Sequence, residues 1–384
     1  MRPEAAAAMA EAAAASVDMA VLEAHASGVI AGITGAEAGY VTSGASAGLL
    51  LATAACIAGL DPVLMARLPD TAGMKDEVIV ARSQRNGYDH AVRAAGARLV
   101  EVGLSDRASG AGIRDAEAWE YAAAVTGRTA AILYVATPDS RPALPDVVAV
   151  GRAAGVPVIV DAAAELPPQA NLGRFIAEGA DLVAFSGGKA IGGPQASGIL
   201  CGRGDLIMAA ALQHLDMDVV AELWDPPPSL IDRRRLGGIP RHGIGRSCKV
   251  GKEEIIGLLT ALDLFVAEGD AARHGRWLAE ARTLAAGFGR PEGIEIALVG
   301  ADDVEAVPKV ELRFSRGKLD AATGLVRALQ GLQPPIFTDP SLRDRGVVIF
   351  NPVGLRPGQA EAVGRAVSDI LRRRDEAPAG AAGP

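Results

Sequence analysis

The chain has 384 residues, and 49% of them are apolar, which is enough for one large domain and a smaller second one. Its formal net charge of -8 at pH 7 argues against a nucleic-acid partner, because nucleic-acid binders carry a basic face, so we expect no nucleic-acid partner. Its three cysteines, Cys56, Cys201 and Cys248, lie far apart, which argues against a disulfide framework and indicates a cytoplasmic protein.

The two ends of the chain predict no targeting or membrane segment. The alanine-rich start is interrupted by acidic residues and has no basic patch before an apolar run, so we expect no signal peptide. The longest uncharged apolar run, residues 47–60, is too short to span a bilayer, so we expect no membrane partner. Residues 374–384, rich in Ala, Gly and Pro, predict a disordered tail.

The chain begins with good helix formers, and residues 1–34 are predicted to form a helical segment of one or two helices. A short strand or turn at 39–42 follows, and then Ser43-Gly44-Ala45-Ser46 opens an apolar helix that runs to residue 58. The free N–H groups and positive dipole end of a helix N-terminus attract anions. This turn therefore has two interpretations, an ordinary helix cap and a phosphate site.

From residue 77 the sequence alternates apolar runs with helix-forming segments. Strands are predicted at 78–80, 99–102, 130–135, 156–160, 182–185 and 198–201, and helices at 88–95, 115–124, 144–154, 171–178 and 205–212. Such alternation is typical of an α/β domain whose mostly parallel sheet is covered on both faces. We predict this large domain over residues 35–250, with its ligand at the carboxyl ends of the strands.

The last third of the chain has a different pattern. Residues 216–250 form a long connection rich in proline, glycine and basic residues, and such connections are usually functional. An amphipathic helix at 252–288 leads into a smaller α+β domain, predicted over residues 251–373. Its elements are strands at 293–299, 309–314 and 347–350 and helices at 319–332 and 357–373. The five histidines are scattered, so no metal site is predicted.

Two charged residues follow predicted strands. Asp161 ends the strand at 156–160, where a buried carboxylate is costly unless it meets a cation or a hydrogen-bond donor. Lys189 follows the strand at 182–185 in a turn with four glycines, which let the backbone approach a bound molecule closely. One helix and one strand separate the two residues, so both side chains can come from neighbouring strand ends. The alternatives are an inert surface lysine and an aspartate that only caps a helix.

An amine, a carboxylate and an anion site together fit pyridoxal 5'-phosphate. Its aldehyde forms a Schiff base with a lysine, and a carboxylate keeps its ring nitrogen protonated so that the ring accepts electrons. Ser186 can offer its hydroxyl to the phosphate, and His90 is suited to cover the ring face, a structural histidine being the alternative. We also predict that bulk at Gly187 or Gly188 weakens cofactor binding before it weakens folding.

Five segments carry a family resemblance, among them SGASAGLLLATAACIAG, FSGGKAIGGPQASGILCGR and IGRSCKVGKEEI. They lie at residues 34–59, 86–97, 156–168, 179–203 and 244–259. The chain resembles the fold-type I pyridoxal phosphate enzymes with an aminotransferase-like fold. Specifically, it resembles the family of bacterial selenocysteine synthase (seryl-tRNA selenium transferase) and D-glucosaminate-6-phosphate ammonia-lyase, in a short form without the tRNA-binding N-terminal domain.

The resemblance implies a role for each candidate residue. Lys189 is implied as the Schiff-base lysine, Asp161 as the partner of the pyridine nitrogen, and His90 as the residue at the ring face. The phosphate is implied to bind Ser43, Gly44, Ala45, Ser46 and Ser186. Arg241, His242 and Arg246 are implied to approach an active site of this or a neighbouring subunit, so a homo-oligomer is expected.

The expected reaction is a lyase reaction on a small amino acid or amino-sugar acid that yields a 2-keto acid and ammonia. Lys189 is the natural base for the alpha proton, and Arg85, Arg241 or Arg246 can hold the substrate carboxylate, unless these arginines are merely solvated. Aldol cleavage, racemisation, transamination and selenium-transferase-like chemistry remain open because they begin in the same way.

Two other classes of function remain. Ser186 and Lys189 have the SxxK spacing of a serine hydrolase, but the glycines between them disfavour the helix that this motif needs, and no SDN or KTG sequence is present. A non-catalytic member that assembles with an active homologue is the other class, and the presence of both Lys189 and Asp161 argues against it.

Overall fold

The computed structural model describes residues 1–104, 115–315 and 319–376. The chain forms two compact units, one made of Met1–Leu166 and Ala170–Ala267, the other of Pro167–Gln169 and the chain from Glu268 onward. The N-terminal helices thus belong to the first unit, which continues past residue 250, and the predicted four-part division of the chain stays a prediction. Of the predicted tail, residues 377–384 lie outside the described residues, and α12 ends at Glu376.

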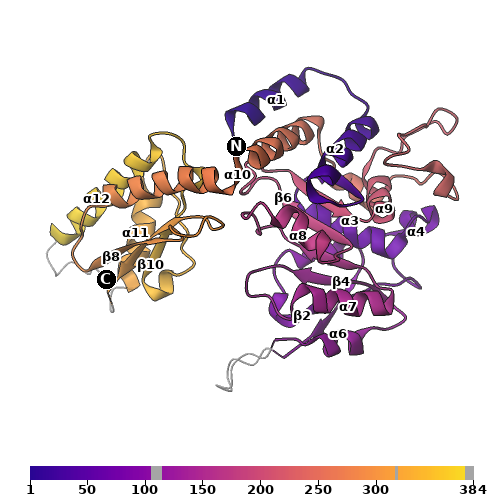
Figure 1. Cartoon of the computed structure of the whole chain (residues 1–384), viewed down its shortest axis with the longest axis horizontal. Coiled ribbons are helices and arrows are strands. Elements are labelled where there is room, and N and C mark those ends of the chain that lie inside the picture. The colour runs from indigo at the N-terminus through magenta and orange to yellow at the C-terminus, as the bar shows by residue number, and fades with distance from the viewer. Residues whose placement is uncertain (105–114, 316–318, 377–384) are drawn as a thin grey trace. The chain divides into compact units, whose positions relative to one another are not determined.

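Most predicted elements of the first unit are present within a few residues of their expected bounds (Figure 1). Its strands are β1 (Ala38–Thr42), β2 (Glu77–Ala81), β3 (Arg98–Val102), β4 (Thr129–Val135), β5 (Val158–Asp161), β6 (Leu182–Ser186) and β7 (Gly198–Gly202). Its helices are α1 (Pro3–Ala13), α2 (Met19–Thr34), α3 (Ala45–Ala58), α4 (Pro62–Arg67), α5 (Asp89–Ala94), α6 (Ala118–Ala124), α7 (Leu144–Ala154), α8 (Asn171–Ala177) and α9 (Gly204–His214).

The seven strands form one sheet in the order β1-β7-β6-β5-β4-β2-β3. The neighbouring pairs from β6 to β3 are parallel, whereas β7 is antiparallel to both β6 and β1. The predicted mostly parallel α/β sheet is therefore confirmed. Because β1 and β6 are both antiparallel to β7, they run in the same direction, and their carboxyl ends lie at the same edge of the sheet.

Both faces of this sheet are apolar and covered by helices (Figure 1). Side chains alternate along a strand, so Val78 and Val80 of β2 pack in one core cluster with α3 and α9, and Ile79 and Ala81 pack in the other with α7 and α8. Burial on two faces explains why the strands are near-continuous apolar runs in the sequence.

The outer edge of β1, the last strand of the sheet, is covered by side chains of α2. Glu23 Oε2 accepts the N–H of Val41 at 3.0 Å, and Ser27 Oγ accepts the N–H of Gly39 at 3.1 Å. These two residues are one helical turn apart, so they reach alternate N–H groups of the strand. The N-terminal helical segment is thereby bound to the sheet edge that leads into the Ser43 turn.

The second unit holds an antiparallel sheet in the order β10-β9-β8, as predicted for an α+β unit. Its elements are β8 (Ile294–Val299), β9 (Lys309–Phe314), β10 (Val347–Phe350), α11 (Leu319–Gln330) and α12 (Gln359–Glu376). The expected single helix at 252–288 is wrong in one respect, because α10 (Lys252–Gly287) is broken at Gly269, where φ is 70° and ψ is 165°. Glycine adopts this conformation without steric cost. No helix within the described residues is long and apolar enough to cross a membrane.

Candidate active site

Three of the candidate segments meet at one edge of the large sheet. Thr42 of β1 pairs with Gly198 of β7, which pairs in turn with Ser186 of β6. Asp161, the last residue of β5, pairs with Ala184 of the same β6. The turn after β1, the turn after β6 and the Asp161 carboxyl therefore start from adjacent strand ends, where ligands of α/β sheets bind.

Asp161 is a buried carboxyl group that is only partly satisfied by the protein. Its residue is 6% exposed, and its Oδ1 accepts the N–H of Ala163 at 3.1 Å. Within the described residues its Oδ2 accepts no hydrogen bond. Burial raises the pKa of Asp161, while the Ala163 N–H and the nearby Lys189 ammonium oppose that rise. A protonated ring nitrogen is the kind of donor that such a carboxylate lacks.

The turn that carries Lys189 is held by its own backbone. Gly187 N–H donates to Ser197 O at 2.9 Å, Gly193 N–H donates to Gly187 O at 2.9 Å, and Gly192 N–H donates to Lys189 O at 3.0 Å. The Lys189 side chain is exposed, and no hydrogen bond or ion pair engages it within the described part of the chain. A hydrogen-bonded turn thus presents the unpaired Lys189 side chain near enough to Asp161 to act on the pKa of that carboxyl group.

Two glycines of this turn leave no room for a side chain. A Cβ at Gly187 would lie 2.2 Å from Ser197 Oγ and 2.6 Å from Leu258 Cδ1, and one at Gly188 would lie 2.8 Å from Gln195 Cα. The space beside both glycines is filled by protein atoms of the same unit. A side chain at either position would therefore press on the packing of the turn itself, and the prediction that bulk here weakens cofactor binding before folding stays a prediction.

The turn before α3 has the properties of an anion site. Its residue Gly44 has φ of 129°, and α3 begins at Ala45 without any side-chain cap on its first N–H groups. Ser46 is exposed at the same helix start, and the Ser186 hydroxyl makes no hydrogen bond within the described residues. Uncapped N–H groups at the positive end of a 14-residue helix fit a phosphate group.

Ser43 differs from the other members of this turn because its hydroxyl already has an acceptor. Its Oγ donates to Cys248 O at 2.7 Å, and His214 Nε2 also lies 3.0 Å from that oxygen. Tyr40 Oη lies 2.9 Å from His214 Nδ1. Since a carbonyl only accepts, Nε2 carries the hydrogen, and Tyr40 donates to Nδ1 of the neutral ring, whose pKa burial lowers. This buried chain fixes the position of the Ser43 turn.

The other predicted residues are less closely tied to this edge. His90 is exposed in the first turn of α5. Arg85 binds the carboxylates of Asp89, at 2.5 Å, and Glu101. Whether His90 covers a ring, and whether Arg85 binds a substrate, stay predictions.

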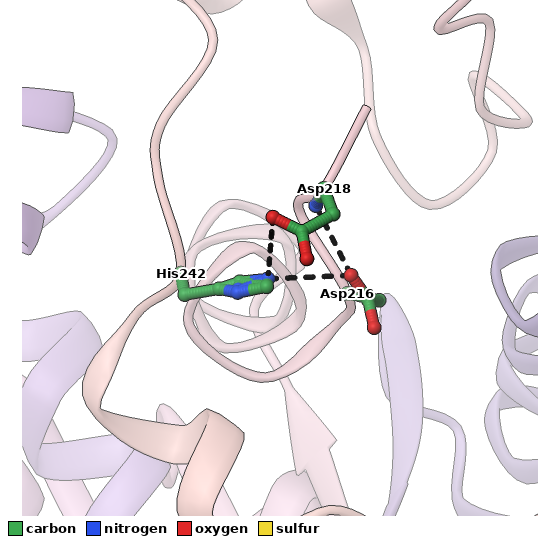
Figure 2. Close-up of side chains that lie close together, drawn as sticks. All are labelled: Asp216, Asp218 and His242. Atoms are coloured by element: carbon green, nitrogen blue, oxygen red, sulfur yellow. Dashed lines mark hydrogen bonds and ion pairs between the residues drawn. The ribbon is translucent and has the colours of Figure 1, made fainter. Parts of the chain in front are cut away.

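The residues predicted from the long connection form a separate group with Asp216. Figure 2 shows the Asp216 and Asp218 carboxylates turned toward the His242 ring, whose Nε2 lies 3.2 Å and 3.6 Å from their Oδ1 atoms. Arg246 donates to Asp216 Oδ2 at 2.6 Å, and Arg241 is exposed. This is the one group of the described residues whose side chains could converge on a metal ion, and the Arg246 guanidinium already neutralises one of its carboxylates.

Sequence reasoning missed two contributors to the site. Glu165 is half-buried, and burial raises its pKa while Arg174 and Lys189 oppose the rise, so its carboxyl group lies within the field of Lys189. The position of Glu165, four residues after Asp161, is the sequence signal that could have indicated a second carboxyl group near Lys189. His214 acts on the Ser43 turn through the Cys248 carbonyl, and no spacing in the sequence links these three residues.

The strand order and the strand-end site define the class of protein, a fold-type I pyridoxal phosphate enzyme. The chain is similar to a solved D-glucosaminate-6-phosphate ammonia-lyase, with a TM-score of 0.77 and 28% identity over 97% of this chain and 92% of that one. A solved serine palmitoyltransferase from S. paucimobilis shares the fold, with a TM-score of 0.53 and 14% identity over 97% of this chain and 84% of that one.

The particular family follows from the sequence comparisons. Residues 11–218 match the family model described as L-seryl-tRNA selenium transferase, so the chain belongs to that family. A 5'-C-glycyluridine monooxygenase-decarboxylase of Streptomyces sp is 32% identical over 97% of this chain and 86% of that protein. A D-glucosaminate-6-phosphate ammonia lyase of Salmonella typhimurium is 34% identical over 71% of this chain and 69% of that protein.

Proposed function

We propose that this chain binds pyridoxal phosphate at the strand-end site and acts as a lyase on an amino-sugar acid or a related small amino acid. The observation that carries the proposal is the buried Asp161 carboxyl, with one oxygen unpaired, beside the free amine of Lys189. The proposal assigns the phosphate to the α3 N-terminus and the Ser186 hydroxyl, and the ring face to His90. When bound, the cofactor supplies an aldehyde for the amine and a ring that accepts electrons.

The protein's own groups then have distinct tasks. Asp161, held by the Ala163 N–H, keeps a proton on the ring nitrogen through its free Oδ2. The Lys189 amine removes the alpha proton of the substrate, and it stands on a turn fixed by three backbone hydrogen bonds. The half-buried Glu165 lies near enough to Lys189 for the lysine to oppose the rise that burial causes in the pKa of Glu165. The net reaction is loss of ammonia, because the water eliminated from the substrate is taken up again on hydrolysis to the 2-keto acid.

Substrate binding and assembly belong to the same proposal. Arg246 lies two residues before Cys248, whose carbonyl accepts the Ser43 hydroxyl, so this segment runs beside the phosphate turn. We assign Arg246 and the exposed Arg241 to the substrate carboxylate, at the site of this subunit or of a neighbour in a homo-oligomer.

A second reaction is favoured by one comparison. The relative named as a monooxygenase-decarboxylase matches 97% of this chain, whereas the ammonia lyase of Salmonella typhimurium matches 71%. Oxidative decarboxylation of an amino acid would consume oxygen and release carbon dioxide, and it would use the same Lys189 and Asp161. The two candidates therefore differ in their co-substrate and products.

The test is a product assay on the cofactor-loaded protein. D-glucosaminate 6-phosphate and other 2-amino-3-hydroxy acids, together with 5'-C-glycyluridine, are assayed for ammonia, 2-keto acid, carbon dioxide and oxygen uptake. Asp161→Asn is the matched variant, since it keeps the acceptor for the Ala163 N–H, and we expect it to lose about 100-fold in rate or more. Release of glycine and an aldehyde would instead assign the chain to the aldolases, and activity unchanged in Asp161→Asn would refute the site.

A further inference from the structure

The proposed function leaves one carboxyl group near the strand-end site without a task. Glu165 lies in the segment that leads from the end of β5 to α8, four residues after Asp161. Its side chain is half-buried, and no hydrogen bond or ion pair engages its carboxyl group within the described residues. A carboxyl group without a protein partner is available to a substrate.

The backbone around Glu165 is fixed on both sides. The Ala162 N–H donates to Ala184 O of β6 at 2.9 Å, and the Glu165 N–H donates to Ala162 O at 3.1 Å. Asn171, which is 5% exposed, donates from its Nδ2 to Glu165 O at 2.7 Å. The segment that carries Glu165 is therefore tied to the strand that leads into the Lys189 turn.

Arg174 of α8 is the neighbouring cation that could make Glu165 a structural ion-pair partner. Its Nε donates to Glu178 Oε1 at 2.7 Å, so the guanidinium already has a carboxylate partner. In the part of the chain that the structure describes, no ion pair joins Arg174 to Glu165. A structural ion pair thus does not account for Glu165.

The surroundings of Glu165 favour the protonated form of its carboxyl group. Burial raises the pKa of Glu165, Arg174 opposes this rise, the Asp161 carboxylate adds to it, and the Lys189 ammonium opposes it. A half-buried carboxyl group with a raised pKa can serve as an acid near neutral pH. The influence of Asp161 and Lys189 also means that Glu165 lies within electrostatic range of both residues.

The proposed lyase reaction needs an acid of this kind. A 2-amino-3-hydroxy acid loses its β-hydroxyl group, and hydroxide leaves a carbon atom readily only when a proton reaches its oxygen. In the proposed function Lys189 accepts the alpha proton and Asp161 keeps a proton on the ring nitrogen. Neither of them begins the reaction as the donor to the leaving oxygen.

We propose that Glu165 is the general acid that protonates the departing β-hydroxyl group of a 2-amino-3-hydroxy acid. Glu165 has this role only if the proposed function holds. As the alpha proton passes to Lys189, the electrons of its C–H bond form a double bond between Cα and Cβ. The bond from Cβ to oxygen breaks, its electron pair leaves with the oxygen, and the Glu165 proton turns the leaving group into water. Lys189 then returns its proton to Cβ, and hydrolysis of the protonated imine releases ammonia and the proton that restores the Glu165 acid.

Leaving groups of different basicity test this role on the cofactor-loaded protein. Release of 2-keto acid is measured from serine and D-glucosaminate 6-phosphate, whose hydroxyl groups need a proton, and from 3-chloroalanine, whose chloride leaves without one. Glu165→Gln should lose about 100-fold in rate or more with the hydroxy acids and stay within about threefold of wild type with 3-chloroalanine. Glu361→Gln, which neutralises an exposed glutamate of α12, should change no rate.

Exchange of the alpha hydrogen gives a readout that does not depend on the leaving group. In deuterated water, proton NMR should show that Glu165→Gln still exchanges the alpha hydrogen of serine, because Lys189 and Asp161 are intact. Equal losses with both kinds of leaving group, loss of the exchange, or an unchanged rate with the hydroxy acids would overturn the role of Glu165. Asp161→Asn should instead lose the exchange and all three activities. A wild-type protein that processes none of the three substrates would overturn the proposed function, and the role of Glu165 with it.

Discussion

Gly198→Ala offers a sharp test of the phosphate turn, because the added methyl group points at the backbone of that turn. A Cβ at Gly198 would lie 2.5 Å from Gly44 C and 2.7 Å from Ala45 N, whereas ordinary contacts begin at 3.4 Å. The turn must therefore move by about 0.9 Å. A hydrogen bond of about 2.9 Å that lengthens by this amount is no longer a hydrogen bond.

The size of the effect follows from the hydrogen bonds that the turn would make to the cofactor phosphate. A hydrogen bond to a charged group contributes about 1.5–3 kcal/mol. Loss of one such bond raises the dissociation constant about tenfold to 150-fold. The assay is an equilibrium titration of the cofactor-free protein with pyridoxal phosphate, followed by absorbance.

A control must separate cofactor binding from folding. Gly28 lies in α2, and no atom lies within 4 Å of the position that an added methyl group would take, so Gly28→Ala should keep the wild-type dissociation constant. Urea unfolding of both cofactor-free variants reports any loss of stability. A wild-type dissociation constant in folded Gly198→Ala would refute the assignment of the Ser43 turn to the phosphate.

Two further predictions concern buried polar groups next to this turn. Burial raises the pKa of Glu23 from 4.5 to about 8. The contribution of this group to the free energy of unfolding is therefore fully present below pH 4.5 and is lost as the pH rises through about 8. Urea unfolding should show this free energy falling by an amount on the order of a few kcal/mol over that range, and the fall should be absent in Glu23→Gln. His214→Phe removes one of the two donors to the Cys248 carbonyl, the other being the Ser43 hydroxyl, and should weaken pyridoxal phosphate binding about fivefold, whereas Tyr40→Phe, which keeps both donors, should bind within about twofold of wild type. Equal affinities in the two variants would exclude His214 as a positioning residue.

The strands and most helices were predictable because their signals are local. A strand such as β6 is a continuous apolar run, and α2 is bounded by the Asp18 cap and a left-handed Gly35. The short helix α4 was missed, although Asp61 and Pro62 form a cap and a first turn there. The break of α10 at Gly269 could not be predicted, because a glycine within a helical pattern is also compatible with a continuous helix.

The candidate site was predictable where topology alone brings residues together. Asp161 and the Lys189 turn follow strands that pair directly, so their proximity depends only on the strand order. The links that depend on side-chain packing were not predictable. Ser43 and Cys248 are 205 residues apart, and a second donor to the Cys248 carbonyl, His214, comes from a third segment.

The central claim is that Lys189 holds the cofactor, and one measurement tests it most directly. The cofactor-loaded protein is reduced with borohydride and digested, and the peptides are analysed by mass spectrometry. We predict that the reduced cofactor is found on the peptide that contains Lys189, and that Lys189→Ala yields no labelled peptide. A label on another lysine, or a wild-type protein that binds the cofactor without being labelled, would contradict the account.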